Sequence, residues 1–98
     1  MSSFFDLIAS NKPVLIDFFA DWCAPCKTMS PILKEVKSSM GDRIKVLKID
    51  VEKNQRLAAA LNVQGVPTLV LYKNKELLWR QSGVVPKNVI ISKINEYL

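Results

Sequence analysis

The sequence predicts an α/β protein in which a mixed four-stranded sheet is flanked by four helices. Segments with apolar residues at helical spacing alternate with short, β-rich apolar runs, and the last two runs are close enough to form a hairpin. The predicted order is therefore α-β-α-β-α-β-β-α. Strands joined through a helix must run parallel with a right-handed crossover, whereas the hairpin adds an antiparallel edge.

Length and composition limit the other possibilities. We expect residues 1–98 to form one domain, because 49% hydrophobic and 23% charged content is ordinary for a globular protein of this size. No apolar stretch is long enough to cross a membrane, and residues 1–6 lack the features of a signal peptide. The net charge of +5 comes from scattered lysines, which does not predict nucleic-acid binding. We expect a cytoplasmic monomer with no membrane or nucleic-acid partner.

The chain opens with a short helix and a buried strand. Residues 3–6, Ser-Phe-Phe-Asp, fit a capping box that begins the helix, and residues 11–13 end it. Residues 14–20 are apolar except for Asp17, which is the pattern of a central strand covered on both faces.

A second helix and a second strand follow. The apolar spacing predicts a helix that runs to about Met40, with Gly41 as its C-terminal cap and a kink at Pro31. Residues 44–49 form the predicted strand, and Asp50 could cap or turn the chain into the next helix.

The remaining elements are a helix, a hairpin and a final helix. The third helix covers residues 55–61 and should end at Asn62, which can take the left-handed conformation. The β-rich runs 68–72 and 77–80 form the predicted hairpin. Pro86 is suited to be the first residue of the last helix, whose apolar stripe reaches the C-terminus.

The only two cysteines, Cys23 and Cys26, lie where the buried strand ends and the second helix begins. Such a pair can close a disulfide, share a metal, or alternate between dithiol and disulfide. The first turn of a helix carries free N–H groups and partial positive charge, which favours a reactive thiolate. The chain has no histidine and no second cysteine pair, so a metal site has little support. A purely structural pair remains the less favoured alternative.

The two thiols should differ in role. Cys23 precedes or starts the first turn, near free donors and solvent, whereas Cys26 lies one turn deeper and should be more shielded. We therefore expect Cys23 to attack a substrate disulfide and Cys26 to resolve the mixed disulfide. Pro25 lies inside the first turn and stiffens the loop between the sulfurs.

Asp17 is the one ionisable residue of the buried strand. Burial should raise the pKa of its carboxyl group, which suits the group to accept and return the proton of Cys26. The alternative is an aspartate that pairs with backbone groups or faces solvent at a sheet edge, and the apolar neighbours favour it less.

These residues resemble the thioredoxin family over nearly the whole chain. Residues 22–27, Trp-Cys-Ala-Pro-Cys-Lys, are similar to the family's W-C-G-P-C-K centre, and Asp17 stands before them as the family's buried aspartate does. Pro31 matches the helix-kinking proline, residues 65–68 resemble the cis-proline loop, and Gly83 corresponds to the glycine beside the substrate groove. The resemblance implies a thioredoxin-like fold.

The resemblance also implies a substrate-binding surface. A cis peptide before Pro67 would place that loop against the cysteines and free the backbone of Val66 to pair with an extended substrate. Without the resemblance, a trans proline at Pro67 and a core position for Trp22 would be the simpler alternatives. The residues implied to contact substrate are Trp22, Ala24, Pro25, Val66, Pro67 and Gly83.

The chain departs from the family pattern at four points. Ala24 replaces the common glycine, and Phe19 replaces a frequent second tryptophan. Val46 stands where many members carry a lysine near the buried aspartate; Lys48 could point to the same face as Asp17 but should lie farther along the strand. The first predicted element is a helix, so we expect four strands without the family's usual first strand.

The function implied by the resemblance is that of a protein-disulfide reductase that works through the Cys23–Cys26 couple, with no cofactor of its own. The implied partners are a flavin- and NADPH-dependent thioredoxin reductase and proteins that contain disulfides. Two alternatives stay open: a thioredoxin-fold oxidant or isomerase, and a binding module in which the cysteines are incidental.

Overall fold

The computed structural model describes residues 2–98, and its elements follow the predicted order. The helices are α1 (Ser2–Ile8), α2 (Ala24–Met40), α3 (Gln55–Ala60) and α4 (Lys87–Asn95), with a 3-10 turn at Gly41–Arg43. The strands are β1 (Val14–Phe19), β2 (Lys45–Asp50), β3 (Thr68–Lys73) and β4 (Glu76–Ser82).

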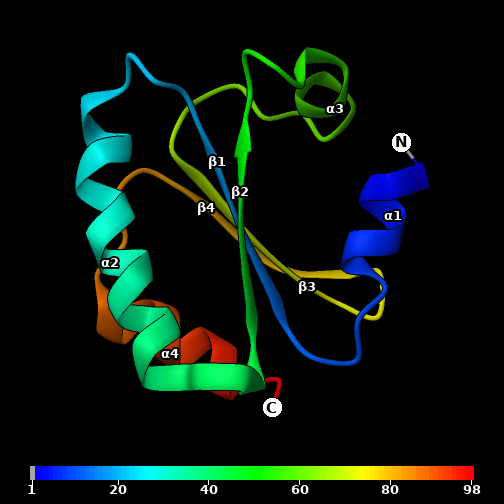
Figure 1. Cartoon of the computed structure of the whole chain (residues 1–98), viewed down its shortest axis with the longest axis vertical. Coiled ribbons are helices and arrows are strands. Elements are labelled where there is room, and N and C mark those ends of the chain that lie inside the picture. Colours follow the sequence, from blue (N-terminus) through cyan, green and yellow to red (C-terminus); the bar gives the residue numbers. More distant parts are fainter. Residues whose placement is uncertain (1) are drawn as a thin grey trace.

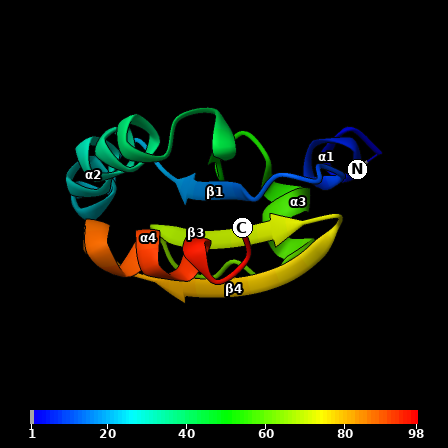
Figure 2. The same ribbon diagram turned by 90° about the horizontal axis from the view of Figure 1, so that it is seen from below.

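The strands form one mixed sheet in the order β2-β1-β3-β4. β1 runs parallel to β2 and antiparallel to β3, and β3 pairs antiparallel with β4. Figures 1 and 2 show α2 and α4 on one face of this sheet and α1 and α3 on the other. The predicted fold class, with a parallel crossover and an antiparallel hairpin, is confirmed.

The core has one layer on each face of β1. Leu15 belongs to a cluster with α2 and α4 residues, whereas Ile16 and Phe18 pack with Phe4 and Ile8 of α1. Because β1 is covered on both sides, its successive side chains are buried whichever way they point. The prediction of a central buried strand is confirmed, and it places the end of β1 beside the start of α2.

The chain turns are made by residues that accept unusual backbone angles. Gly41 has φ +60° and its N–H bonds to the carbonyl of Lys37, so it ends α2 as predicted. Asn62 follows α3 with φ +56°. Asn74 and Lys75 both have positive φ and join β3 to β4 in a two-residue turn, which suits the twist of a hairpin.

Two predicted helix starts are wrong, the first by two residues and the second by one. The capping box at Ser3 does not exist, because α1 already includes Ser2 and a cap residue must lie outside the helix. Pro86 is the residue before α4 rather than its first residue, with an extended ψ of 148°. Capping signals locate a helix end only to within one or two residues.

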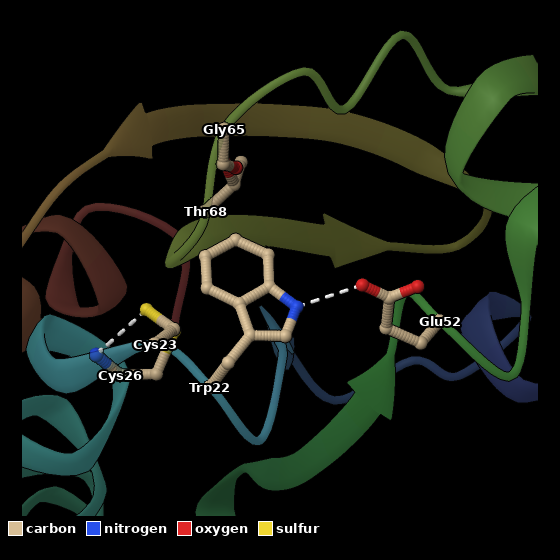
Figure 3. Close-up of a disulfide and its surroundings, with 6 residues drawn as sticks. All are labelled: Trp22, Cys23, Cys26, Glu52, Gly65 and Thr68. Atoms are coloured by element: carbon tan, nitrogen blue, oxygen red, sulfur yellow. Dashed lines mark hydrogen bonds between the residues drawn. A yellow bond between two sulfur atoms is a disulfide. The ribbon is translucent and has the colours of Figure 1, made fainter.

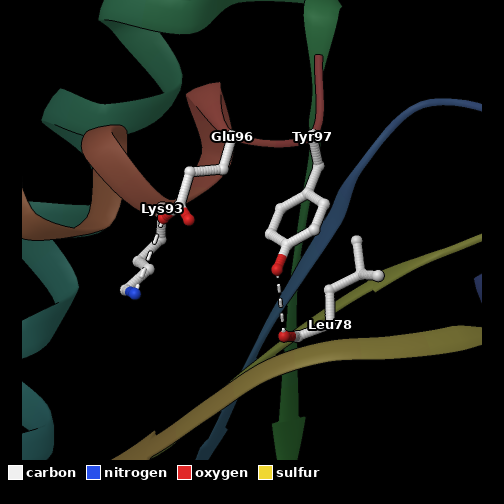
Figure 4. Close-up of polar contacts among 4 residues, drawn as sticks. All are labelled: Leu78, Lys93, Glu96 and Tyr97. Atoms are coloured by element: carbon white, nitrogen blue, oxygen red, sulfur yellow. Dashed lines mark hydrogen bonds and ion pairs between the residues drawn. The ribbon is translucent and has the colours of Figure 1, made fainter.

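The C-terminus is anchored to the sheet by Tyr97. Its hydroxyl donates to the carbonyl of Leu78 at 3.5 Å, and its own carbonyl accepts from Lys73 Nζ at 2.7 Å. Figure 4 shows the Tyr97–Leu78 contact beside the exposed Lys93–Glu96 ion pair of 3.5 Å. None of the helices in residues 2–98 combines the length and hydrophobicity that a membrane crossing requires.

Candidate active site

The cysteine pair lies at the first turn of α2. Cys23 is the N-cap, with φ −91° and ψ 108°, and Pro25 occupies the first turn, where its missing N–H removes no helical hydrogen bond. The two cysteines form a disulfide with their Cα atoms 5.2 Å apart. Figure 3 shows Cys23 Sγ accepting the N–H of Cys26 at 3.1 Å. A sulfur atom therefore takes the capping position that a side-chain oxygen usually fills.

The two cysteines are almost equally buried, which corrects the predicted difference in exposure. Cys23 is 3% exposed and Cys26 is 4% exposed. The two cysteines form one buried cluster with Ala20, and Phe19, Val51 and Val66 pack against this cluster. What distinguishes the sulfurs is their backbone setting, since Cys23 is the cap that receives the helix N–H.

Asp17 is fully buried, as the sequence predicts. Neither carboxylate oxygen has a hydrogen-bond partner among the described residues. Burial raises the pKa of Asp17 from 3.8 to about 6, and the positive charge of Lys48 opposes this rise without cancelling it. The group can therefore exchange a proton near neutral pH, which the ordinary carboxyl pKa would not allow.

Lys48 lies closer to Asp17 than the sequence predicts. The two residues are register partners across the β1–β2 ladder, so the expectation that Lys48 lies farther along the strand is wrong. Its ammonium donates to Ser30 Oγ at 3.1 Å and stands 4.7 Å from the centre of the Phe19 ring. Lys48, Ser30 and Cys26 line one surface pocket, so this cation borders the site.

The loop before β3 completes the other side of the site. The Val66–Pro67 peptide is cis, and Val66 packs against the cysteine cluster. Figure 3 shows Thr68 beside Gly65, and the Thr68 hydroxyl donates to the Gly65 carbonyl at 2.6 Å. The N–H of Gly83, which has φ +89°, donates to the Pro67 carbonyl at 2.8 Å. The structure thus brings together the loop and the glycine that the resemblance pointed to.

Trp22 is a surface residue and not a core aromatic. Its side chain is 71% exposed, and its indole N–H donates to Glu52 Oε1 at 2.7 Å, as Figure 3 shows. Sequence reasoning missed Glu52 because it lies 30 residues away. The available signal was topological: parallel strands bring their carboxyl ends to one edge, so residues after β2 lie near residues after β1. Ala24 and Pro25 are exposed beside Trp22.

Fold and site together define a class of protein. Two cysteines that can form a disulfide lie at a strand-to-helix junction of a βαβ unit. This is the arrangement of thioredoxin-fold thiol-disulfide oxidoreductases.

Comparisons with known proteins agree with this class. The thioredoxin family model matches residues 1–96, so the chain belongs to the thioredoxin family. It is 39% identical to thioredoxin of Bacillus subtilis (strain 168), over 96% of this chain and 90% of that protein. It is 44% identical to the chloroplastic thioredoxin Y of Oryza sativa subsp. japonica, over 99% of this chain but only 58% of the rice protein. A mutant thioredoxin from Halobacterium salinarum NRC-1 superimposes with a TM-score of 0.88 at 36% identity, over 99% of this chain and 84% of that one.

Proposed function

We propose that this chain is a protein-disulfide reductase, as its family membership and its cysteine pair suggest. The observation that supports this most directly is the disulfide at the N-cap of α2, next to the exposed Trp22. In the proposed reaction, the Cys23 thiolate attacks one sulfur of a substrate disulfide, a mixed disulfide forms, and the other substrate sulfur leaves as a thiolate.

Resolution is the second step. Cys26 loses its proton to Asp17, and its thiolate attacks Cys23 Sγ. The mixed disulfide breaks, the second substrate thiolate leaves, and the Cys23–Cys26 disulfide closes. Two electrons have passed to the substrate. Burial and the raised pKa of Asp17 support its role, because a carboxyl group with a pKa of about 6 can accept and return a proton at neutral pH.

We propose that substrates bind on the surface around the pair. Trp22, Ala24 and Pro25 are exposed on the α2 side, and Val66, Pro67 and Gly83 approach from the β3 and β4 side. An extended substrate segment would pair with the backbone of Val66. A flavin- and NADPH-dependent thioredoxin reductase would return the disulfide to the dithiol form. We also propose that residues 1–98 are one domain that acts as a monomer in the cytoplasm.

The redox potential distinguishes this function from its alternatives. We expect equilibration with glutathione to give a redox potential of about −270 mV, and we expect the chain to reduce insulin disulfides. A potential of about −120 mV would instead identify an oxidant. A binding module predicts that changing both cysteines to serine leaves the biological activity intact. We expect that variant to have no reductase activity while keeping the far-UV CD spectrum of the fold.

A further inference from the structure

The outer edge of β2 carries a feature that the redox site does not use. β2 is an end strand of the sheet and pairs only with β1 among the described residues. In Figure 1 it is the strand nearest the viewer, and no helix lies in front of it. An edge strand exposes backbone groups that can pair with another extended chain.

The hydrogen-bond pattern between β1 and β2 shows which backbone groups of β2 point away from β1. Lys45 N–H donates to the Pro13 carbonyl and Val51 N–H to the Phe19 carbonyl, each at 2.9 Å, so the odd-numbered residues of β2 bond to β1. The even-numbered residues therefore present their N–H and C=O groups outward. Val46 and Lys48 are the central residues of this outward set, and their backbone groups have no partner among residues 2–98.

At both ends of this outer edge, side chains already donate hydrogen bonds to the outward-facing carbonyl groups. Lys37 Nζ donates to the Ile44 carbonyl at 2.8 Å, and Asn54 Nδ2 donates to the Asp50 carbonyl at 2.9 Å. The part of the edge whose backbone groups lack a partner is thus short and centred on residues 46–48. It fits one segment of a few extended residues and does not fit a long strand.

The positive charge of this edge favours an acidic binding segment. Lys45 and Lys48 of β2 are exposed, and the chain carries a net charge of +5. Two copies paired at this edge would bring like charges together, which is one way that edge lysines prevent self-association. The same lysines attract an acidic strand.

The two faces of the edge differ in chemistry. Lys48 lies on the face that α2 covers, where it meets Ser30. Leu47 and Ile49 are half-buried on the opposite face, packed against the α1 cluster. An added strand would therefore place acidic side chains on the α2 face and apolar side chains on the α1 face.

We propose that the outer edge of β2 binds a short, extended, acidic segment of a partner protein by strand addition at Val46 and Lys48. The partner segment alternates acidic and apolar residues. The backbone groups of Val46 and Lys48 take no part in the proposed redox reaction, so the proposal does not depend on the redox activity of the chain.

The test uses the disulfide form of the full chain and a blocked six-residue peptide that alternates Glu and Val. We expect NMR titration to shift the amide signals of Val46 and Lys48 and to slow their hydrogen exchange several-fold. A peptide that alternates Lys and Val should have neither effect. No protection at Val46 and Lys48, or equal effects of both peptides, would overturn the proposal.

Two variants test the geometry. Val46→Pro removes an outward N–H but no bond to β1, so it should abolish peptide binding while the far-UV CD spectrum stays unchanged. Lys48→Glu reverses the charge on the α2 face, so it should weaken binding of the acidic peptide and strengthen binding of the basic one. Unchanged binding by a folded Val46→Pro protein would contradict strand addition. Protection that appears without peptide as the protein concentration rises would instead identify a second copy as the occupant and overturn the proposal.

Discussion

Asp17 and Lys48 face each other across the parallel β1–β2 ladder, yet they make no ion pair. The Lys48 ammonium instead donates to Ser30 Oγ and lies over the Phe19 ring. The cation is near enough to lower the pKa of Asp17 but leaves both carboxylate oxygens without a partner among the described residues. This arrangement keeps the carboxyl group able to change protonation state near neutral pH, because a direct ion pair would hold it ionised.

Removal of Lys48 should therefore raise the pKa of Asp17 further. The change is Lys48→Met, and the measurement is an NMR pH titration of the Asp17 carboxyl carbon in the disulfide form, in which no thiol titrates. Lys45→Met is the matched control, because Lys45 lies on the same strand but pairs with Val14 and not with Asp17. An identical Asp17 pKa in the Lys48→Met and control proteins would contradict the assigned contact.

Asp17 should also make stability depend on pH. The pKa of its carboxyl is about 6 in the folded state and 3.8 when unperturbed, so between these values the folded protein binds more protons than the unfolded chain. The stabilisation from protonated Asp17 is present below about pH 4 and is lost as the pH rises through about 6, with a total of about 3 kcal/mol.

Asp17→Asn tests this dependence. Above about pH 6 the variant should unfold at higher urea concentration than the unchanged protein, and the difference should shrink below about pH 4. Urea unfolding at several pH values measures it, and we expect one cooperative transition if residues 1–98 are one domain. The variant should also resolve mixed disulfides more slowly. A stability difference that stays constant with pH would contradict the raised pKa.

The Glu52 carboxylate should hold the Trp22 indole in place. In a Trp79→Phe background, which leaves Trp22 as the only tryptophan, Glu52→Ala should lower the fluorescence anisotropy. A lost hydrogen bond of about 1 kcal/mol should raise KM for a protein disulfide by no more than about fivefold. Glu52→Gln keeps an oxygen acceptor and should behave nearly normally. Anisotropy that is unchanged in Glu52→Ala would remove Glu52 from this role.

Gly83 is required by its backbone angle and not by lack of space. Its φ is +89°, and a Cβ atom built there would meet no atom within 4 Å. Gly83→Ala should cost about 1 kcal/mol or more of unfolding free energy, because side chains disfavour positive φ. Gly65→Ala is the matched control, since Gly65 has equal space but no positive φ. Equal urea midpoints for both variants would contradict this explanation.

Most of the fold could be predicted from the sequence, because local residue patterns mark the helices and strands. The apolar run of β1 and the helical spacing after Cys23 required no knowledge of distant contacts. The prediction of a cis peptide at Pro67 came from the family resemblance alone, since a trans proline is the better expectation from the local sequence.

The parts that the sequence could not predict depend on how distant segments meet. The contact between Lys48 and Asp17 depends on the register of two strands, and the bond between Trp22 and Glu52 joins residues that lie 30 positions apart. The equal burial of the two cysteines arises from Val51 and Val66, which come from different loops. No local pattern reports these contacts.

The order of attack is the central claim, and trapping by single-cysteine variants tests it most directly. Cys26→Ser should accumulate a mixed disulfide between Cys23 and a substrate protein, which mass spectrometry of the non-reduced peptides would locate, because resolution is blocked. Cys23→Ser should trap little or none under the same conditions. The account predicts a substrate peptide attached at Cys23; a substrate attached predominantly at Cys26 in the Cys23→Ser protein, with none on Cys26→Ser, would contradict it.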